Sequence, residues 1–443
     1  MMKATWFWAG FVLLATPLAG QQRLTVADAV LLAERAHPSV AAAEAGLARA
    51  ASGTAEARSA LLPSLSLDAN ATRHAEPMVV APLHGFDPQD PPQFERTLYQ
   101  GGVNLSYTLF DGGARGARIG RASRLEDAAR ETARATRQAL AAQVSGAYLR
   151  VLAQREQLDA QRSRFAAVAL EQTRAGLLFA EGRAALLVRL RADAALAAAL
   201  ADTVQAAAQL DVAERTLARL LGLEPEALRA LALLPAAAPA AAPPARDAAL
   251  AEALDRSAEV ARARAQVAAA ARGAGEARAL WLPRLQLGAR YVEYGSDAGR
   301  EAGEWQTGVQ LGYPLFTGGS RGAARDRAQA ELSAAEAELR SVELRVADAV
   351  DAAIASWASA EARATALDDA VTQAIEVARV EKLALDQGAG IQTDYLTAEA
   401  ELLRARSALT DARYSALLAR VELARLTGVL DAAWLRSHLE SQP

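Results

Sequence analysis

The chain has 443 residues and a formal net charge of −4 at pH 7, so it lacks the basic excess expected of a nucleic-acid-binding protein. It contains no cysteine, which excludes disulfides, thiol catalysis and thiolate metal sites. Apolar residues make up 52% of the chain and aromatic residues only 5%. Because most of the apolar residues are alanines, this composition favours long, closely packed helices over a thick globular interior.

The first residues have the layout of a secretory signal peptide. Lys3 precedes an apolar stretch over 6–15, and small residues follow up to Gly20. The stretch is too short to span a bilayer as a helix. We therefore expect residues 1–20 to be a signal peptide. Gln21 stands where a lipoprotein would carry its acylated cysteine, so we expect no lipid at the mature N-terminus.

The mature chain contains an internal repeat. The motif Leu-Phe-x-Gly-Gly ends at Gly113 and again at Gly319, which are 206 positions apart, and Gly222 and Gly428 keep the same offset further along. Duplication on this scale predicts two copies of one structural unit.

The copies differ by one insertion. The Leu-Pro pairs that end at Pro63 and Pro283 are 220 positions apart, so the first copy carries 14 extra residues between its Leu-Pro pair and its glycine motif. We place the first repeat at 21–234, an exposed Ala/Pro linker at 235–245 and the second repeat at 246–443.

Each copy contains two segments that alternate strictly between apolar and polar residues, within 64–109 and 284–315. This pattern predicts strands with one apolar and one polar face, paired as two isolated hairpins. Each segment has about ten residues, the length that a tilted strand needs to cross a bilayer. The aromatic residues near the strand ends fit interfacial girdles; they are Tyr99, Tyr107, Trp281, Tyr291, Trp305 and Tyr313.

An ordinary soluble antiparallel sheet with one solvent-exposed face would give the same alternation of apolar and polar residues. The exported chain and its helical surroundings favour the membrane interpretation. Lipid cannot satisfy an open sheet edge, and four strands are too few for a barrel. We therefore expect several chains to contribute their hairpins to one barrel.

The remaining sequence predicts long helices. No proline interrupts about 113–175, and ~60 residues of α-helix extend ~90 Å. A second long helix is expected at about 319–386, and return helices at about 184–221 and 394–427. Apolar residues with heptad-like spacing recur in phase in both copies and predict coiled-coil packing; they are Leu140, Val144, Ala147, Val151, Leu158, Phe165 and Val168, with Val346, Val350, Ala353, Trp357, Ala364, Val371 and Ala374.

The duplicated glycine motif marks the passage from a strand to a long helix. Asp111 and Thr317 are good N-cap residues, and the glycine pairs after them supply the bend. The junction residues are therefore Phe110, Asp111, Gly112 and Gly113 in the first copy and Phe316, Thr317, Gly318 and Gly319 in the second.

Taken together, two copies of helix, Leu-Pro, strand, loop, strand, Leu-Phe-x-Gly-Gly, long helix, glycine turn and return helix resemble the TolC-like outer-membrane efflux protein family. The resemblance covers essentially the whole mature chain. It implies a mainly helical α+β fold in a homotrimer, with four strands per chain in one 12-stranded transmembrane barrel and a helical barrel beneath it. It also implies the outer membrane of a Gram-negative bacterium, a large periplasmic part, a periplasmic adaptor (membrane fusion) protein and an inner-membrane pump of the RND or ABC type.

The resemblance further implies two functional regions. The family's tunnel entrance carries an aspartate pair, of which Asp394 matches the first and Thr397 replaces the second. We expect these residues at the pore constriction, where three copies of Asp394 would favour cations. The alternative is that Asp394 only caps its helix. At the adaptor-contacting helix tips only the glycines match, Gly182 and Gly388.

No catalytic motif is present, and we expect neither enzyme activity nor a cofactor. His74, Met78 and His84 cluster in one loop, but such surface histidines are more often bystanders than metal ligands. The sequence therefore predicts a passive channel that exports small molecules such as drugs. Metal-cation efflux and type I protein secretion use the same component and remain open, as does a periplasmic coiled-coil scaffold or adaptor.

Overall fold

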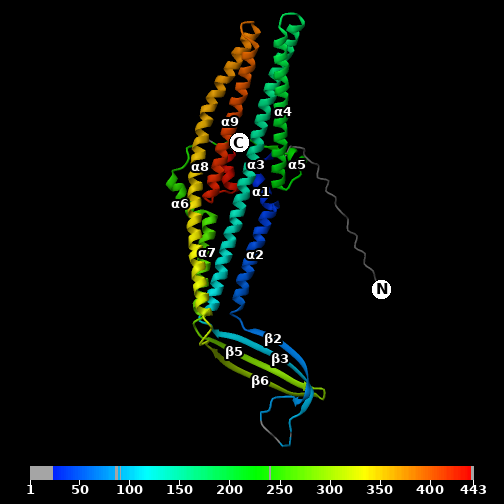
Figure 1. The fold of residues 1–443 in the computed structure, drawn as a ribbon, viewed down its shortest axis with the longest axis vertical. Helices are drawn as coiled ribbons and strands as arrows, with labels where there is room; N and C mark the ends of the chain where they lie inside the picture. Colours follow the sequence, from blue (N-terminus) through cyan, green and yellow to red (C-terminus); the bar gives the residue numbers. More distant parts are fainter. Residues whose placement is uncertain (1–22, 85–87, 90, 239–240, 441–443) are drawn as a thin grey trace, which may run out of the picture.

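The computed structural model describes residues 23–84, 88–89, 91–238 and 241–440; the predicted signal peptide lies outside them. The molecule is elongated, with helical hairpins at one end, a sheet at the other and short helices around the middle (Figure 1). No helix in the described ranges is both long and apolar enough to cross a membrane.

Two helical hairpins give the molecule its length. The long helices α3 (Ala114–Ala180) and α8 (Ser320–Asp386) have 67 residues each, and they begin 206 positions apart. The return helix α4 (Leu186–Leu221) packs against α3, and α9 (Gln392–Leu426) packs against α8. At 1.5 Å per residue, each long helix extends ~100 Å.

The half of each long helix nearest the sheet is covered by a shorter helix. Helix α2 (Pro38–Ser59) packs against α3, and α7 (Ala258–Ala279) lies between α3 and α8. Helices α1 (Val26–Ala36) and α6 (Arg246–Arg256) precede them in the chain and have 11 residues each. Four helices thus run side by side toward the sheet (Figure 1).

The sheet has four antiparallel strands in the order β2-β3-β5-β6. They are β2 (Ser64–Val79), β3 (Phe94–Phe110), β5 (Arg284–Ser296) and β6 (Gly299–Gly312). The expectation of two isolated hairpins is wrong, since β3 pairs with β5 and joins them. The contact between α3 and α7, which lead out of β3 and into β5, brings these two strands together.

The second strand segment is shorter than expected, because β6 ends at Gly312 and not near 315. Pro314 follows, and a proline has no N–H to donate to a strand ladder. The first long helix extends past the predicted limit of 175 to Ala180.

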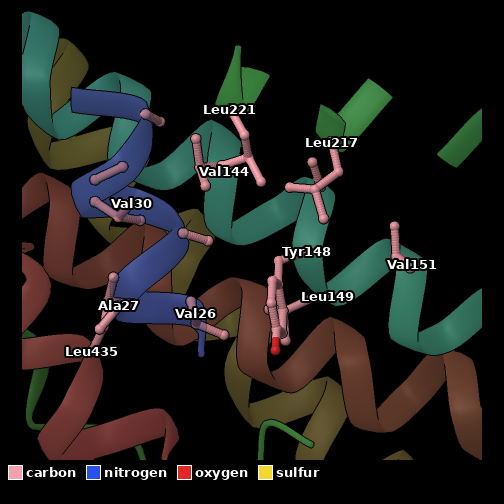
Figure 2. Packing of buried hydrophobic residues seen from close by; sticks show 14 of the residues in the cluster. Val26, Ala27, Val30, Val144, Tyr148, Leu149, Val151, Leu217, Leu221 and Leu435 are labelled. Atoms are coloured by element: carbon pink, nitrogen blue, oxygen red, sulfur yellow. The ribbon is translucent and has the colours of Figure 1, made fainter. Parts of the chain in front are cut away.

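The predicted apolar seam is buried in its central part. Leu140, Val144 and Val151 of α3 are at most 2% exposed, as are Val346 and Val350 of α8. The residues of α3 face α1, α4 and the C-terminal helix α10 (Ala432–Leu439) in the largest cluster of buried side chains (Figure 2).

Tyr148 fixes the middle of the molecule. Its buried hydroxyl lies 2.7 Å from the carbonyl oxygen of Leu24 and 2.8 Å from that of Leu234. Leu24 belongs to β1 (Arg23–Leu24), which pairs in parallel with β4 (Ala232–Leu233); α5 (Pro225–Arg229) precedes β4. Burial raises the pKa of the Tyr148 phenol, so the hydroxyl stays a donor.

We predict that Tyr148→Phe destabilises the fold. It removes the hydroxyl donor from the carbonyl oxygen of Leu234, which costs about 1–3 kcal/mol, whereas the carbonyl oxygen of Leu24 still accepts from the backbone N–H of Leu234. Denaturant unfolding of the purified protein measures the loss. Tyr107→Phe is the matched control, because the Tyr107 hydroxyl has no hydrogen-bond partner among the described residues. Equal stabilities of the two variants would contradict the role of Tyr148.

Candidate functional site

The four-stranded sheet has an apolar face that the described residues leave uncovered. The strand register aligns one row across all four strands, in which Leu67 is opposite Val103, Val103 opposite Tyr291 and Tyr291 opposite Trp305. These side chains are 81%, 38%, 43% and 74% exposed, respectively. Alternate residues of a strand point to opposite faces, so the row belongs to a single apolar surface. A surface of this kind marks contact with lipid or with another protein.

The opposite face of the sheet is polar. The neighbouring row contains Ser66, Asn104, Arg290 and Gln306, each opposite the next. The Asp68 carboxylate on this face accepts hydrogen bonds from the Asn104 amide and, at 3.3 Å, from Arg290 Nη2. The outer edges of β2 and β6 have no partner strand in the described part of the chain. The sheet is therefore amphipathic, and both of its edge strands are unpaired among the described residues.

The first strand-to-helix junction is held by Asp111. Its Oδ1 accepts from the backbone N–H of Gly113 at 3.1 Å, and its Oδ2 accepts from the backbone N–H of Arg115 at 2.9 Å. The formal N-cap is Gly113, with φ of 86°, so the prediction of Asp111 at that position is wrong by two residues. Gly112 has φ of 69°, and a Cβ there would lie 2.6 Å from Cβ of Leu282.

The second junction has the same backbone course and different chemistry. Gly319 is the N-cap of α8, with φ of 85° and no side-chain cap hydrogen bond, so the prediction that Thr317 caps this helix is wrong. The reason is that two left-handed glycines, Gly318 and Gly319, place the first helical turn beyond the motif. Phe316 precedes them, is 88% exposed and lies outside β6.

The turns at the tips of the two helical hairpins have similar glycine conformations and are uncrowded. Gly182 and Gly388 have φ of 72° and 75°, and a Cβ on either would meet nothing within 4 Å. The backbone conformation, and not crowding, therefore calls for glycine. At the first tip Glu181 and Arg183 form an exposed ion pair of 3.2 Å.

Asp394 and Thr397 lie on the exposed side of α9. Asp394 is in the first helical turn, and the Thr397 hydroxyl donates to the carbonyl oxygen of Thr393 at 2.8 Å. Tyr395 and Ala398 are buried on the opposite side of the same turns. Among the described residues Asp394 forms neither an ion pair nor a side-chain hydrogen bond. Its carboxylate is therefore exposed to solvent beside the helix.

A buried polar contact ties this end of α9 to the other hairpin. Glu171 of α3 is 1% exposed, and its Oε1 accepts from Gln392 Nε2 at 2.9 Å. Arg174 donates to the same carboxylate through Nε at 2.8 Å, which raises the pKa of the guanidinium. Arg191 of α4 adds a hydrogen bond of 3.2 Å to the Thr393 hydroxyl. We call these five residues the tip joint.

The tip joint was not predicted from the sequence. A signal for it exists, because Glu171 follows Val168 by three residues and so lies on the same side of α3, one position before the seam continues. A carboxylate on this side of the helix needs partners when it is buried. The sequence alone does not show that Gln392, 221 positions away, supplies one of them.

The described residues contain no group of three or more His, Asp or Glu side chains placed to hold a metal ion. Of the side chains considered for a soft metal, His84 has Nε2 at 3.3 Å from Oε1 of Glu304 on β6. This contact is an ion pair when the histidine is protonated.

Several solved structures share this fold. The outer membrane protein VceC of Vibrio cholerae is 20% identical, with a TM-score of 0.77 over 91% of this chain and 96% of that chain. The outer membrane channel CmeC of Campylobacter jejuni is 16% identical, with a TM-score of 0.77 over 94% and 87%. The open state of the outer membrane channel MtrE of Neisseria gonorrhoeae is 21% identical, with a TM-score of 0.75 over 92% and 90%. No protein of curated function matches the chain.

The model of one protein family matches most of the chain. That family is described as outer membrane efflux protein, and its model covers residues 30–223 and 249–429. The match confirms the resemblance inferred from the repeated motifs. The chain belongs to the outer membrane efflux protein family.

Proposed function

We propose that the chain is the outer-membrane duct of a tripartite efflux system, a passive homotrimer that exports small molecules such as drugs. The observation that carries this proposal is the amphipathic sheet with an unpaired strand at each edge. It supports an assembly of several chains with the membrane around the sheet.

The unpaired edges of β2 and β6 require partners once the sheet is in lipid, because hydrocarbon cannot satisfy exposed N–H and C=O groups. Pairing of β6 in one chain with β2 in the next would continue the sheet from chain to chain, and no additional strand would be needed to close it into a barrel. Three chains supply twelve strands, enough for a barrel with an open lumen. The exposed row from Leu67 to Trp305 then faces lipid, and Asp68 and Arg290 face the lumen.

Two measurements test the duct. The purified protein should migrate in detergent as a trimer that heat dissociates, and it should give single-channel conductance in planar bilayers. A water-soluble monomer without conductance would overturn the proposal and favour a periplasmic scaffold.

We predict that Leu67→Arg impairs insertion and that Ser66→Arg does not. The first change places a charge on the lipid-facing side of the barrel, at a cost of about 2–4 kcal/mol near the bilayer centre. The second places the same charge on the polar face of the same strand. The fraction of protein folded into phospholipid vesicles measures the difference, and equal fractions would argue against the assignment of the two faces.

We place the pore constriction at Asp394 and Thr397. Both side chains lie on the exposed side of α9. Glu401, two turns after Asp394, is exposed on the same side. In a trimer three Asp394 carboxylates would converge near the helix tips. A ring of carboxylates attracts cations and repels anions in a narrow pore.

Asp394→Asn should therefore reduce the preference of the channel for cations over anions. The reversal potential across a bilayer with unequal salt concentrations measures it, and the potential should move toward zero. Asp369→Asn is the control, since it removes an exposed carboxylate of α8 that lies 17 residues before the end of that helix. An unchanged potential in Asp394→Asn, or an equal change in both variants, would remove Asp394 from the constriction.

The tip joint would hold Asp394 in position. We predict that Glu171→Ala frees the first turn of α9, because Gln392 and Arg174 lose their shared acceptor. Hydrogen exchange of the amides at 392–396 should accelerate about tenfold, the effect of losing one charged hydrogen bond. Glu181→Ala removes an exposed carboxylate at the neighbouring tip and should leave these amides unchanged. Similar exchange in both variants would contradict the joint.

The exposed glycine tips, at Gly182 and Gly388, are where a periplasmic adaptor would dock, with an inner-membrane pump supplying the energy. The proposed lumen carries both signs of charge, Asp68 and Arg290, and favours no single class of ion. Metal-cation efflux and type I protein secretion therefore stay alternatives for the cargo. Transport assays with the adaptor and pump encoded nearest to this chain would distinguish them.

A further inference from the structure

The two repeats differ in charge at the place where their strands meet their long helices. Thr317 of the second repeat corresponds to Asp111 of the first, 206 positions earlier, so the second repeat lacks this carboxylate. Arg284 begins β5 where the first repeat begins β2 with Ser64, so the second repeat also gains a cation. Both differences make the second junction more positive than the first.

The carboxylate of the first repeat satisfies an arginine that both repeats share. Arg115, in the first turn of α3, donates from Nε to Asp111 at 3.1 Å and from Nη1 to the carbonyl oxygen of Ala60 at 3.3 Å. Arg321 is its counterpart in α8, and its Nε and Nη1 are buried without a hydrogen-bond partner among the described residues. Its Nη2 reaches only the carbonyl oxygen of Leu315, at 3.4 Å. The second junction therefore contains a guanidinium with unused donors.

Aromatic rings hold the Arg321 guanidinium without satisfying its donors. The guanidinium carbon lies 4.7 Å from the ring centre of Trp281 and 5.7 Å from that of Tyr313. These rings attract the cation but supply no oxygen for its N–H groups. The donors are therefore left for an acid group from outside the chain.

A cavity of about 570 Å³ opens beside Arg321, and a volume of this order accommodates a small organic molecule. Arg284 also lines the cavity and forms no ion pair with any described residue. The described lining contains no Asp or Glu, while Thr317 and Ser320 add hydroxyl groups and Leu282 adds an apolar wall. The cavity is therefore positively charged and has an apolar side.

The strands present their polar face to this cavity. Arg284 and Gln286 of β5 alternate in step with Arg290, and the register places Gln286 opposite Gln310 and Arg290 opposite Gln306. A second hollow, of about 460 Å³, shares Gln286 and Gln310 with the cavity and extends along the sheet to Arg290. The proposed barrel turns this face to the lumen. The cavity therefore opens into the duct.

The unpaired positive charge is confined to this end of the duct. Further along the same face Arg290 is paired with Asp68 at 3.3 Å. Asp394, in the first turn of α9, lies at the opposite end of the long helices (Figure 1). A long helix extends ~100 Å, whereas charges in 0.1 M salt are screened over ~10 Å. Neither carboxylate therefore neutralises the two arginines of the cavity.

We propose that Arg284 and Arg321 bind an organic anion inside the duct, a solute with a carboxylate group and an apolar body. The carboxylate takes the place that Asp111 fills in the first repeat, once the Arg321 side chain turns its unused donors toward the cavity. The apolar body lies against Leu282. This inference rests on the proposed function, because the duct turns the polar face of the sheet to the lumen.

Titration calorimetry of the detergent-solubilised full-length protein with naphthoate tests the proposal, after subtraction of a titration into protein-free micelles. We expect one naphthoate bound per chain. Naphthamide has the same rings without the charge and should not bind, whereas equal binding of the two would overturn the anion site. Acetate lacks the rings and should bind about tenfold more weakly or less, since it buries little apolar surface. Equal binding of acetate would overturn the role of the apolar wall.

Two variants test the residues. Thr317→Asp supplies the carboxylate of the first repeat from within the chain, so it should weaken naphthoate binding about tenfold or more, as expected from the loss of charge-assisted hydrogen bonds. Gln306→Glu is its control, because it adds the same charge to the polar face of β6 outside the cavity. Arg284→Gln should also weaken binding, whereas Arg325→Gln removes an exposed arginine one turn further along α8 and should not. Unchanged binding in Thr317→Asp and Arg284→Gln would overturn the site.

Bilayer conductance separates this proposal from the proposed function. A conducting channel that does not bind naphthoate refutes only the anion site, because the arginines are then satisfied in another way, such as by a carboxylate of a neighbouring subunit. Naphthoate binding that depends on Arg284, in a protein without conductance, refutes the duct.

Discussion

The unpaired backbone at the two edges of the four-stranded sheet is the constraint on which the rest of the molecule depends. A soluble sheet can shield an edge with charged side chains, a bulge or a covering loop. A sheet in lipid has no water to satisfy its edge groups, so its edges must meet other strands. The order β2-β3-β5-β6 leaves one edge from each half of the chain available for such pairing.

Closure of the sheet also constrains the helices beneath it. Each of the four strands is connected directly to one of the helices α2, α3, α7 and α8, so the order of strands sets the order of helices. The contacts of α7 with both α3 and α8 continue the same sequence of neighbours. A closed ring of strands would therefore impose a closed ring of helices, and the glycine motifs let the chain turn from one ring into the other.

The regular parts of this fold could be predicted because they depend on neighbouring residues. Alternation such as that of Leu65 and Leu67 with Ser64 and Ser66 is enough to identify a strand and its two faces. The absence of proline after Gly113, with apolar residues in heptad-like spacing, is enough to identify a long helix. Family membership followed from the order of these local patterns.

What was missed depends on contacts between distant residues. The pairing of β3 with β5 joins segments that are nearly 200 residues apart, and the alternation of either strand says nothing about its neighbour. The partnership of Glu171 with Gln392 is equally distant. The N-cap was misplaced for another reason, because sequence preference ranks Asp and Thr as caps without showing that two left-handed glycines intervene.

The two repeats show how one backbone can serve different chemistry. Their junctions have the same pair of left-handed glycines, and their long helices have equal lengths, so the backbone does not require different side chains. Asp111 satisfies Arg115 from within the chain, which makes the first junction independent of its surroundings. Thr317 leaves Arg321 with unmet donors, and a buried donor without a partner is costly. The rings of Trp281 and Tyr313 hold this guanidinium instead, so the second junction relies on aromatic contacts where the first relies on a carboxylate.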